Sequence, residues 1–589
     1  MKLVFKKSYT DLVELLKSIG GEWDDTQKNK KVLNSDGGIL IWYESTSNIQ
    51  FQGKEDKKTR LEDQVRRLLH PEETSEVMQQ EGCLESQESE TVPVDLQVEA
   101  SISQQYLNGN FDRSELIIGI VSAVGTETAR VVTSLTDRLK GFGYDVKEIR
   151  VSSLLSPATS SNEYKRIRQL MAAGDTLRKE NDNNAILAYG ASKLVKERRS
   201  EVQKTAYIIN SLKHPDEVEI LRKIYGQGFY LFGIHTDKKR RLDYLISDKG
   251  LLPSEAEELI TIDEDEKVSH GQRTRDTYHL ADFFLNFGKN DDHVKNTIQR
   301  FLDLIFSDPF KNPTFDEFSM FMAFSSSVRS GDLSRQVGAV ITNNQQIMAT
   351  GANECPASGG GLYWAEVDKD TGKVTDITAG KDYKRGRDSN KVEQNEIMQE
   401  ILEDIRSINS VTPEVLSEIK SQLKESRISD LTEFGRVVHA EMEAIMSCTR
   451  AGISCVGATL YCTTFPCHNC AKHVIAAGIS RVVYVEPYPK SKALEFYSDS
   501  ITLRTTLDKD EKSELVIFEP FTGVGARRFL DFFSMNLGVG NKLKRKNKDG
   551  IAVSWAREEA HPRVALLPKS YLEIEEAAIE VFNKRVRNV

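Results

Sequence analysis

Two short segments of the chain, Val438-His439-Ala440-Glu441 and Pro466-Cys467-His468-Asn469-Cys470, combine a histidine with two cysteines spaced three apart. Histidine nitrogen and cysteine sulfur are ligands that Zn²⁺ prefers, and three such ligands leave the fourth tetrahedral position open for water. An open position is typical of a catalytic zinc site. We therefore predict that His439, Cys467 and Cys470 bind a catalytic Zn²⁺ ion.

The residues beside these ligands bear on whether the metal is catalytic or structural. Pro466 suits the start of a helix, whose exposed N–H groups stabilise a thiolate. Glu441 lies two residues after the predicted histidine ligand, where a carboxylate can act as general acid and base without binding the metal. The alternative is a structural zinc knuckle with Cys462 or His468 as its fourth ligand.

Together, the two segments resemble the H-x-E and P-C-x-x-C pattern of zinc-dependent nucleobase deaminases. In such enzymes the metal lowers the pKa of a coordinated water. The resemblance implies that Glu441 accepts the proton of this water, that the oxygen attacks C4 of a cytosine ring, and that Glu441 returns protons to N3 and to the departing ammonia. The product is a uracil ring.

The sequence around the zinc segments alternates strand and helix patterns, which favours an α/β fold. We assign residues 301–589 to a cytidine-deaminase-like α/β/α domain with strands at Val337–Ile341, Gln346–Gly351, Ala458–Cys462 and Arg481–Val485. A long charged stretch from Glu366 to Glu433 interrupts this domain. A lid, an inhibitory or oligomer-contact element, and a solvated helical insertion are the alternatives for it.

Residues 113–300 show apolar runs of strand length that alternate with polar helical stretches. This pattern predicts a doubly wound α/β domain, with a parallel sheet covered on both faces. The predicted strands are Leu116–Val121, Asp145–Val151, Asn184–Tyr189, Thr205–Ile209 and Gly228–Ile234.

The N-terminal part predicts a small α+β module over residues 1–65, in which Gly38–Tyr43 and Ile49–Phe51 form a hairpin. A docking or oligomerisation unit and a nucleotide-binding or nucleic-acid-binding unit are the alternatives. Residues 66–112 are rich in Glu, Gln and Ser and poor in aromatic residues, which is typical of an acidic, solvated linker.

The composition of the 589 residues excludes several classes of protein. An apolar fraction of 39% and a charged fraction of 29% are ordinary for a soluble globular chain. No run approaches the ~20 apolar residues of a membrane span, and no secretory signal is visible, so we expect a cytoplasmic protein without a membrane partner. A formal net charge of −10 gives no global attraction for a polyanion.

Upstream of the zinc segments, Ser334–Ile341 and Ala349–Pro356 resemble the first strand pair of deoxycytidylate deaminases. On that resemblance, Asn353 contacts the sugar of the substrate nucleotide, and Arg335 lies near its phosphates.

Downstream, Val485–Ser491 and Phe518–Phe529 resemble one branch of this family, the bacterial anti-phage dCTP/dCMP deaminases. Members of the branch join an N-terminal P-loop-kinase-like domain to a C-terminal deaminase, and the resemblance covers residues 113–589. It implies conversion of free deoxycytidine nucleotides, dCTP or dCMP, to deoxyuridine nucleotides, which depletes dCTP and starves viral DNA synthesis. Deaminases of this fold are commonly oligomeric, so the resemblance also implies a homo-oligomer. Because unchecked loss of dCTP would harm the host cell, we expect a regulator, for which an inhibitory RNA, a protein antitoxin and a nucleotide are the alternatives.

The kinase-like region departs from the phosphate-binding pattern G-x4-G-K-[ST]. Between Gly119 and Gly125 lie five residues, and no lysine follows. We therefore expect a degenerate nucleotide-binding or regulatory domain in which Gly119, Ser122, Gly125 and Thr126 bind the nucleotide.

Two other functions share the same zinc chemistry. One is a polynucleotide deaminase that acts on tRNA or single-stranded DNA. The other is a nucleotide-sensing scaffold, whose deaminase is the effector of a partner bound at residues 1–60. The fused nucleotide-fold domain favours free mononucleotides as substrates.

Overall fold

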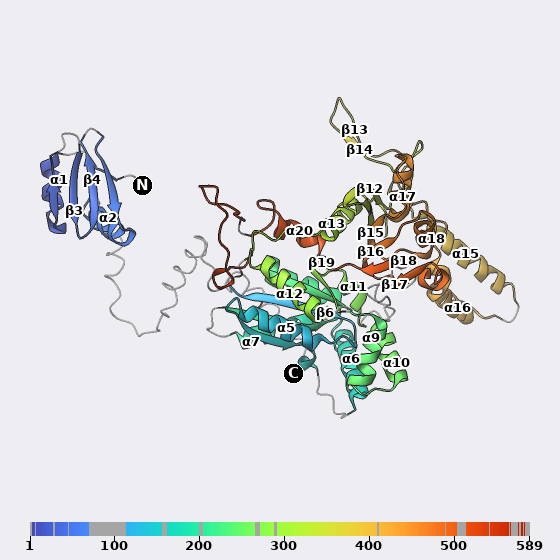
Figure 1. The fold of residues 1–589 in the computed structure, drawn as a ribbon. Coiled ribbons are helices and arrows are strands. Elements are labelled where there is room, and N and C mark those ends of the chain that lie inside the picture. Colours follow the sequence, from blue (N-terminus) through green and yellow to red (C-terminus); the bar gives the residue numbers. More distant parts are fainter. Residues whose placement is uncertain are drawn as a thin grey trace. The chain divides into compact units, whose positions relative to one another are not determined.

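A computed structural model shows two compact units, Met1–Ile102 and Ser103–Val589 (Figure 1). The residues it describes are 3–5, 8–26, 30–44, 46–69, 114–155, 162–199, 204–264, 271–287, 291–408, 411–488, 491–503, 514–540, 542–564, 566, 575, 579–580 and 582–583. The predicted linker 66–112 lies outside them, apart from 66–69. Within these ranges, no helix is both long and apolar enough to cross a membrane.

The first unit contains one antiparallel sheet in the order β1-β5-β4-β3-β2. The predicted hairpin lies within it, as β4 (Gly38–Tyr43) paired with β5 (Asn48–Gly53). Leu40 and Trp42, two residues apart on β4, share a buried cluster with residues of α1 (Tyr9–Leu15) and α2 (Glu55–Leu69). The other elements are β1 (Leu3–Val4), the 3-10 turn Lys17–Ile19, β2 (Glu22–Asp24) and β3 (Lys30–Ser35).

The first sheet of the second unit has five parallel strands in the order β7-β8-β6-β9-β10, and the short β19 adds antiparallel to β10. Adjacent residues of β6 face opposite sides of the sheet, since Ile118 packs with α5 and α12, whereas Ile117 packs with α7 and α8. Helices therefore cover both faces. The elements are β6 (Leu116–Ser122), α5 (Thr128–Lys140), β7 (Asp145–Arg150), the 3-10 turn Val151–Leu154, α6 (Glu163–Glu180), α7 (Ile186–Arg198), β8 (Thr205–Leu212), α8 (Pro215–Tyr225), the 3-10 turn Gly226–Gly228, β9 (Phe229–His235), α9 (Lys238–Asp243), the π-helical turn Tyr244–Asp248, α10 (Pro253–Glu264), α11 (Thr274–Tyr278), β10 (Phe283–Asn286) and α12 (Asp291–Ile305).

Two features of this region differ from the sequence expectation. The predicted strand at Asn184–Tyr189 is wrong, because this stretch begins α7, a helix buried on several sides that gives the same unbroken apolar run as a buried strand. The predicted boundary between residues 300 and 301 lies inside α12. That helix continues past it because Phe301, Leu302 and Ile305 are buried against the first sheet.

The second sheet has the strand order β12-β11-β15-β16-β18-β17. Strand β11 is antiparallel to both neighbours, and the others run parallel to β15. Val340 packs with α13 on one face and Ala339 with α17 on the other, which confirms the predicted α/β/α layers. The elements are α13 (Phe315–Ser327), β11 (Gly338–Asn343), β12 (Gln346–Ala352), α17 (Ala440–Arg450), β15 (Thr459–Thr464), α18 (His468–Ala476), β16 (Arg481–Glu486), α19 (Ala493–Phe496), β17 (Ile501–Leu503), β18 (Val516–Pro520), β19 (Gly523–Val524), α20 (Ala526–Phe533) and the 3-10 turn Arg557–Glu559.

Two glycines bring the helices close to this sheet. A Cβ atom at Gly338 would lie 1.9 Å from the carbonyl oxygen of Ala323 on α13. A Cβ atom at Gly351 would lie 2.1 Å from the carbonyl oxygen of Ala440 on α17. Because glycine alone fits such close approaches, these positions set how deeply both helices pack.

The charged stretch after Glu366 forms a hairpin and a pair of helices beside the second sheet (Figure 1). The two long helices, α15 and α16, pack against each other and against the short turn that follows them. The elements are β13 (Glu366–Val367), β14 (Val374–Thr375), α14 (Asp382–Arg385), α15 (Ser389–Arg406), α16 (Pro413–Glu425) and the 3-10 turn Arg427–Asp430.

The two sheets of the second unit share an apolar core. Tyr278 of α11 and Phe284 of β10 belong to the same buried cluster as Val483 of β16. Helix α20 adds a polar link, because Arg528 donates to the carbonyl oxygen of Phe229 on β9 at 2.7 Å. The sheets therefore pack as one body.

Candidate active site

The three predicted zinc ligands lie at the starts of two helices. His439 is the N-cap of α17, Cys467 is the N-cap of α18, and Cys470 lies in the first turn of α18. Nδ1 of His439 lies 3.2 Å from Sγ of Cys470 and 3.5 Å from Sγ of Cys467. Because both helices cover the same face of the second sheet, ligands that are distant in sequence meet.

The geometry of this triad fits a tetrahedral zinc ion. Zn–S bonds of about 2.3 Å and Zn–N bonds of about 2.0 Å imply separations of about 3.5 Å between ligand atoms. The three ligand atoms all lie within 4.8 Å of one another. Among the residues that the structure describes, this is the single metal-binding group, and neither Cys462 nor His468 belongs to it. The site therefore has three protein ligands, as an open zinc site does.

The two cysteines differ in their protonation. Hydrogen bonds from Cys470 and His439 lower the pKa of the Cys467 thiol to about 4. The N–H of Cys470 also donates to this sulfur, at 3.4 Å. The pKa of Cys470 is raised, because its thiol donates to Cys467 and is buried. One thiolate is thus present before the metal binds, and zinc would displace the proton of the other.

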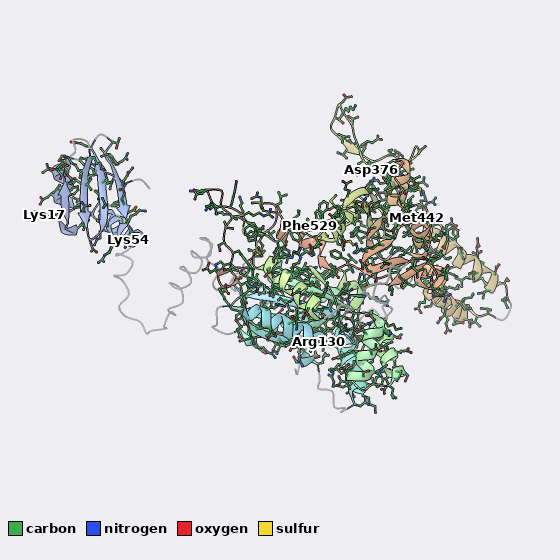
Figure 2. All side chains as sticks on the ribbon, viewed as in Figure 1. Lys17, Lys54, Arg130, Asp376, Met442 and Phe529 are labelled. Atoms are coloured by element: carbon green, nitrogen blue, oxygen red, sulfur yellow. The ribbon has the colours of Figure 1, made fainter. Side chains whose placement is uncertain are left out.

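Glu441 lies in the first turn of α17, the helix on which Figure 2 labels Met442. Only 4% of its surface is exposed. Burial raises the pKa of its carboxyl, while the charge of His439 opposes this shift. A carboxyl with a raised pKa can accept a proton and give it back near neutral pH.

A cavity of about 240 Å³ opens beside these groups, and we call it the catalytic cavity. Its walls include His439, Cys467 and Glu441. The predicted substrate residues Arg335 and Asn353 line the same cavity. The structure therefore brings the predicted acid–base group, two of the metal ligands and both predicted nucleotide contacts to one place.

Arg335 and Asn353 hold different positions in this cavity. The guanidinium of Arg335 pairs with Glu486, and its side chain is half exposed. The Asn353 side chain bonds to the backbone, since its Oδ1 accepts from the N–H of Val337 at 2.6 Å. Its Nδ2 donates to the carbonyl oxygen of Arg335 at 2.8 Å. Asn353 thus fixes the segment that carries Arg335.

The charged insertion and the short segment after it supply a wall of the catalytic cavity whose residues the sequence did not single out. Arg436 pairs with Asp382 and donates to the carbonyl oxygen of Gly380 at 3.1 Å. Arg436 lies three residues before His439, and this proximity is the one sequence signal that points to it. The cavity residues from this part of the chain are Asp382, Asp388, Asn390, Thr432, Gly435 and Arg436.

The four residues predicted to bind a nucleotide in the first sheet are separated by the structure. Gly119 lies inside β6, where a Cβ atom would come within 2.7 Å of the Phe229 ring, so it serves packing in the sheet. Ser122, Gly125 and Thr126 line a cavity of about 440 Å³ at the carboxyl edge of the parallel strands. Gly125 has a φ of +83°, which glycine adopts readily.

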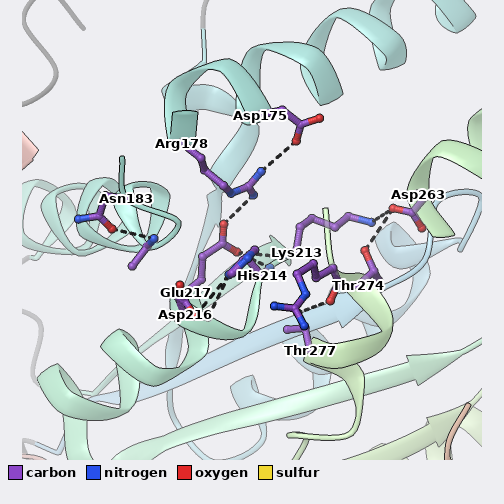
Figure 3. Close-up of polar contacts among 12 residues, drawn as sticks. Asp175, Arg178, Asn183, Lys213, His214, Asp216, Glu217, Asp263, Thr274 and Thr277 are labelled. Atoms are coloured by element: carbon purple, nitrogen blue, oxygen red, sulfur yellow. Dashed lines mark hydrogen bonds and ion pairs between the residues drawn. The ribbon is translucent and has the colours of Figure 1, made fainter. Parts of the chain in front are cut away.

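The carboxylate of Asp263 on α10 bonds to the loop after β6 and to Lys213. Asp263 accepts from the N–H of Val124 at 2.8 Å. It also accepts from Nζ of Lys213 at 2.9 Å, as Figure 3 shows. The hydroxyl of Thr274 donates to the same carboxylate at 3.2 Å, and Lys213 also donates to the carbonyl oxygen of Ser122 at 2.8 Å. A backbone N–H, a lysine and a hydroxyl are the groups that P-loops present to a phosphate and its metal. In this protein the carboxylate of Asp263 accepts hydrogen bonds from these three groups.

Comparison with known proteins relates the C-terminal part of the chain to one family. The profile of the cytidine and deoxycytidylate deaminase zinc-binding region matches residues 313–486. The deoxycytidylate deaminase of Enterobacteria phage T4 is 33% identical over 171 residues, which are 29% of this chain and 77% of that protein.

Two further relatives match over shorter segments. The ComE operon protein 2 of Bacillus subtilis (strain 168) is 36% identical over 83 residues, which are 14% of this chain and 42% of that protein. The deoxycytidylate deaminase of Homo sapiens is 30% identical over 121 residues, which are 19% of this chain and 57% of that protein. The chain thus spans about half the length of these two relatives.

Proposed function

Because the chain belongs to the deoxycytidylate deaminase family, we propose that it is a zinc-dependent hydrolytic deaminase that converts deoxycytidine nucleotides to deoxyuridine nucleotides. One observation carries this proposal. His439, Cys467 and Cys470 form a three-ligand metal site, and the buried carboxyl of Glu441 opens onto the same cavity.

The residues of the site divide the chemistry between them. Bound zinc would supply a water whose pKa is about 7. His439, Cys467 and Cys470 hold the metal, and the starts of two packed helices fix their positions. Glu441 accepts a proton from the water, passes it to N3 of the cytosine ring, and carries a second proton to the amino group that leaves C4 as ammonia. Its burial and raised pKa suit transfer in both directions.

Substrate binding in this proposal uses the two arginines of the catalytic cavity. Arg335 and Arg436 are paired with Glu486 and Asp382, respectively. The phosphates of the nucleotide replace these carboxylates as partners, because guanidinium binds phosphate with the same paired hydrogen bonds. Asn353 holds the Arg335 segment in place and contacts the sugar.

We extend the proposal to the first sheet of the second unit as a degenerate, regulatory nucleotide-binding region. Ser122, Gly125 and Thr126 line its cavity. The bonds of Asp263 to Lys213 and to the loop after β6 support a region that does not transfer phosphate, because the lysine is already neutralised.

The biological role follows from the resemblance to the anti-phage branch. Loss of dCTP during infection would stop viral DNA synthesis. The enzyme would act in the cytoplasm as a homo-oligomer under the control of an inhibitory RNA, a protein antitoxin or a regulatory nucleotide. The insertion that walls the catalytic cavity is a candidate lid or oligomer contact.

Mass spectrometry of the reaction products tests the proposal. The full-length, zinc-loaded protein is incubated separately with dCMP, dCTP, CTP, single-stranded DNA and tRNA, and Glu441→Ala protein serves as the blank. We expect deaminated product from dCMP or dCTP alone. Product from a polynucleotide alone would replace the proposal with a polynucleotide deaminase, and no product from any substrate would overturn it.

A further inference from the structure

A second cavity, of about 230 Å³, lies between the two sheets of the second unit, and we call it the inter-sheet cavity. Strands from both sheets end at it. His235 ends β9, Leu503 ends β17, Pro520 ends β18, and Pro487 follows the end of β16. Ligands of parallel sheets bind outside the carboxyl ends of the strands. Here the carboxyl ends of two such sheets meet at one cavity.

Two hydroxyl groups in the wall of the inter-sheet cavity have no hydrogen-bond partner among the described residues. They belong to Thr236 and Tyr278, which are 5% and 6% exposed. The ring of Tyr278 is held against β9, where a Cβ atom at Gly233 would come within 3.0 Å of it. Buried polar groups in folded proteins are nearly always paired with protein, water or ligand. The two hydroxyls are therefore available to a polar ligand or to water at this cavity.

The rest of the wall favours a planar, heteroaromatic ligand. Tyr278, Tyr484 and Phe518 supply aromatic rings, and further apolar surface comes from Ala123, Ile234, Pro487, Leu503 and Pro520. Burial lowers the pKa of His235 to about 4, so its imidazole is neutral near pH 7 and offers one donor and one acceptor. Aromatic faces with a few fixed polar groups are typical of sites that bind a base.

Cationic side chains extend the site. Lys238, Arg241 and Arg275 all line the inter-sheet cavity. Asp237 also lines this cavity, so the wall carries three cationic side chains and one carboxylate beside the Asp263–Lys213 pair. Lysine and arginine are the side chains that bind phosphate. A ligand with a base at one end and a phosphate at the other matches this distribution.

We propose that the inter-sheet cavity binds a nucleoside 5′-monophosphate, at a site separate from the catalytic cavity. The base stacks among the aromatic rings and bonds to the hydroxyls of Thr236 and Tyr278. The phosphate faces the cationic side chains.

Residues 486–488 connect this site to the catalytic cavity. Pro487 lines the inter-sheet cavity, and Tyr488 lines the catalytic cavity. Glu486, the last residue of β16, pairs with Arg335. A ligand that displaces Pro487 therefore shifts the neighbouring Glu486, and Glu486 is the partner of the proposed substrate-binding residue Arg335. This coupling rests on the proposed function, whereas the binding site itself does not.

Binding is measured by isothermal titration calorimetry on full-length, zinc-loaded Glu441→Ala protein, so that no turnover is involved. The probes are AMP, GMP and dTMP, with ribose 5-phosphate as a probe that lacks a base. We expect at least one nucleotide to bind with one site per chain, and ribose 5-phosphate to bind at least tenfold more weakly. Tyr278→Phe and Thr236→Val should each weaken nucleotide binding about tenfold, the effect of one lost hydrogen bond.

The matched control is Tyr207→Phe. Tyr207 also has a buried hydroxyl without a partner among the described residues, but it lines neither cavity. This variant should bind as the parent does. None of the three substitutions removes a protein hydrogen bond that the structure shows, so all should keep the parent's melting temperature or raise it.

The outcomes separate the inference from the proposed function. Absence of binding by all three nucleotides would overturn the inference, even if the protein deaminates dCMP or dCTP. Binding that survives both Tyr278→Phe and Thr236→Val would also overturn the inference. It would belong to the catalytic cavity if it is lost when zinc is removed, and to the cavity lined by Ser122, Gly125 and Thr126 if it is not. Binding that the cavity variants weaken supports the inference, even if no deaminase activity is found. In active protein, the bound nucleotide should change KM for the deaminase substrate, and Tyr278→Phe should abolish that change.

Discussion

Replacement of Gly351 by alanine tests how closely α17 must pack on the second sheet. A Cβ atom at this position would lie 2.1 Å from the carbonyl oxygen of Ala440 and 2.6 Å from the nitrogen of Ala444. Both are backbone atoms of α17, so neither can rotate away as the end of a side chain can. The helix must move by about 1 Å to restore an ordinary carbon-to-oxygen contact of ~3.3 Å.

The expected effects follow from that movement. Overpacking of a core contact costs about 1–3 kcal/mol of unfolding free energy. Ala440 lies between His439 and Glu441, so the same shift displaces a zinc ligand and the proton carrier together. A misplacement of about 1 Å at a reacting group can cost about 100-fold in rate. We expect Gly351→Ala to lose stability, to bind zinc more weakly, and to retain about 1% of any deaminase activity.

Urea denaturation and the zinc content of the purified protein measure these effects. The matched control is Gly174→Ala in α6, where the nearest atom to the new Cβ would be 3.6 Å away. Alanine there should stabilise the protein by about 0.5–1 kcal/mol, because it favours a helix more than glycine does. A Gly351→Ala protein that keeps one zinc per chain and unfolds within about 0.5 kcal/mol of the parent would refute the reasoning.

Three further predictions concern single contacts. Cys467→Ser should abolish stoichiometric zinc, as measured by atomic absorption, whereas Cys462→Ser should keep it; equal zinc loss in both would favour a structural knuckle. Asp263→Asn should lower the free energy of unfolding, measured by urea denaturation, by about 3–5 kcal/mol, because it leaves Lys213 buried without a counter-charge. Adding Lys213→Met should restore the free energy of unfolding. An unchanged free energy of unfolding in the single variant would be incompatible with a buried pair. Burial holds the pKa of His235 at about 4, below its ordinary value of 6.5, so the unfolded chain binds a proton at this histidine before the folded chain does. The free energy of unfolding should therefore fall as the pH drops from about 6.5 to about 4. Melting temperatures of the parent and of His235→Gln at pH 7 and pH 5 measure this effect, and an equal drop in melting temperature for both proteins would contradict it.

The zinc triad could be predicted because short segments determine it. Cys467 and Cys470 share one helical turn, and His439 and Glu441 share another, so local spacing places each pair. The α/β/α layers around them were also predictable, because the strands show strong apolar patterns.

Other parts of the site depend on tertiary contacts that leave no local pattern. Asp263 meets Val124 across 139 positions of sequence, and Tyr278 reaches the inter-sheet cavity only because two sheets pack together. Asp382 of the catalytic cavity wall lies in an insertion whose composition is simply charged, and its partner Arg436 lies just after that insertion. The stretch that begins α7 was predicted as a strand because a buried helix and a buried strand show the same apolar run.

The most direct test of the central claim compares zinc content and ammonia release for the parent and for Glu441→Gln, with dCMP and dCTP as substrates. The proposed role of Glu441 predicts the same zinc content in both proteins and a fall in ammonia release of about 10²–10⁴-fold in the variant. A zinc-loaded Glu441→Gln protein that releases ammonia at the parent rate would contradict the claim that this carboxyl carries the proton.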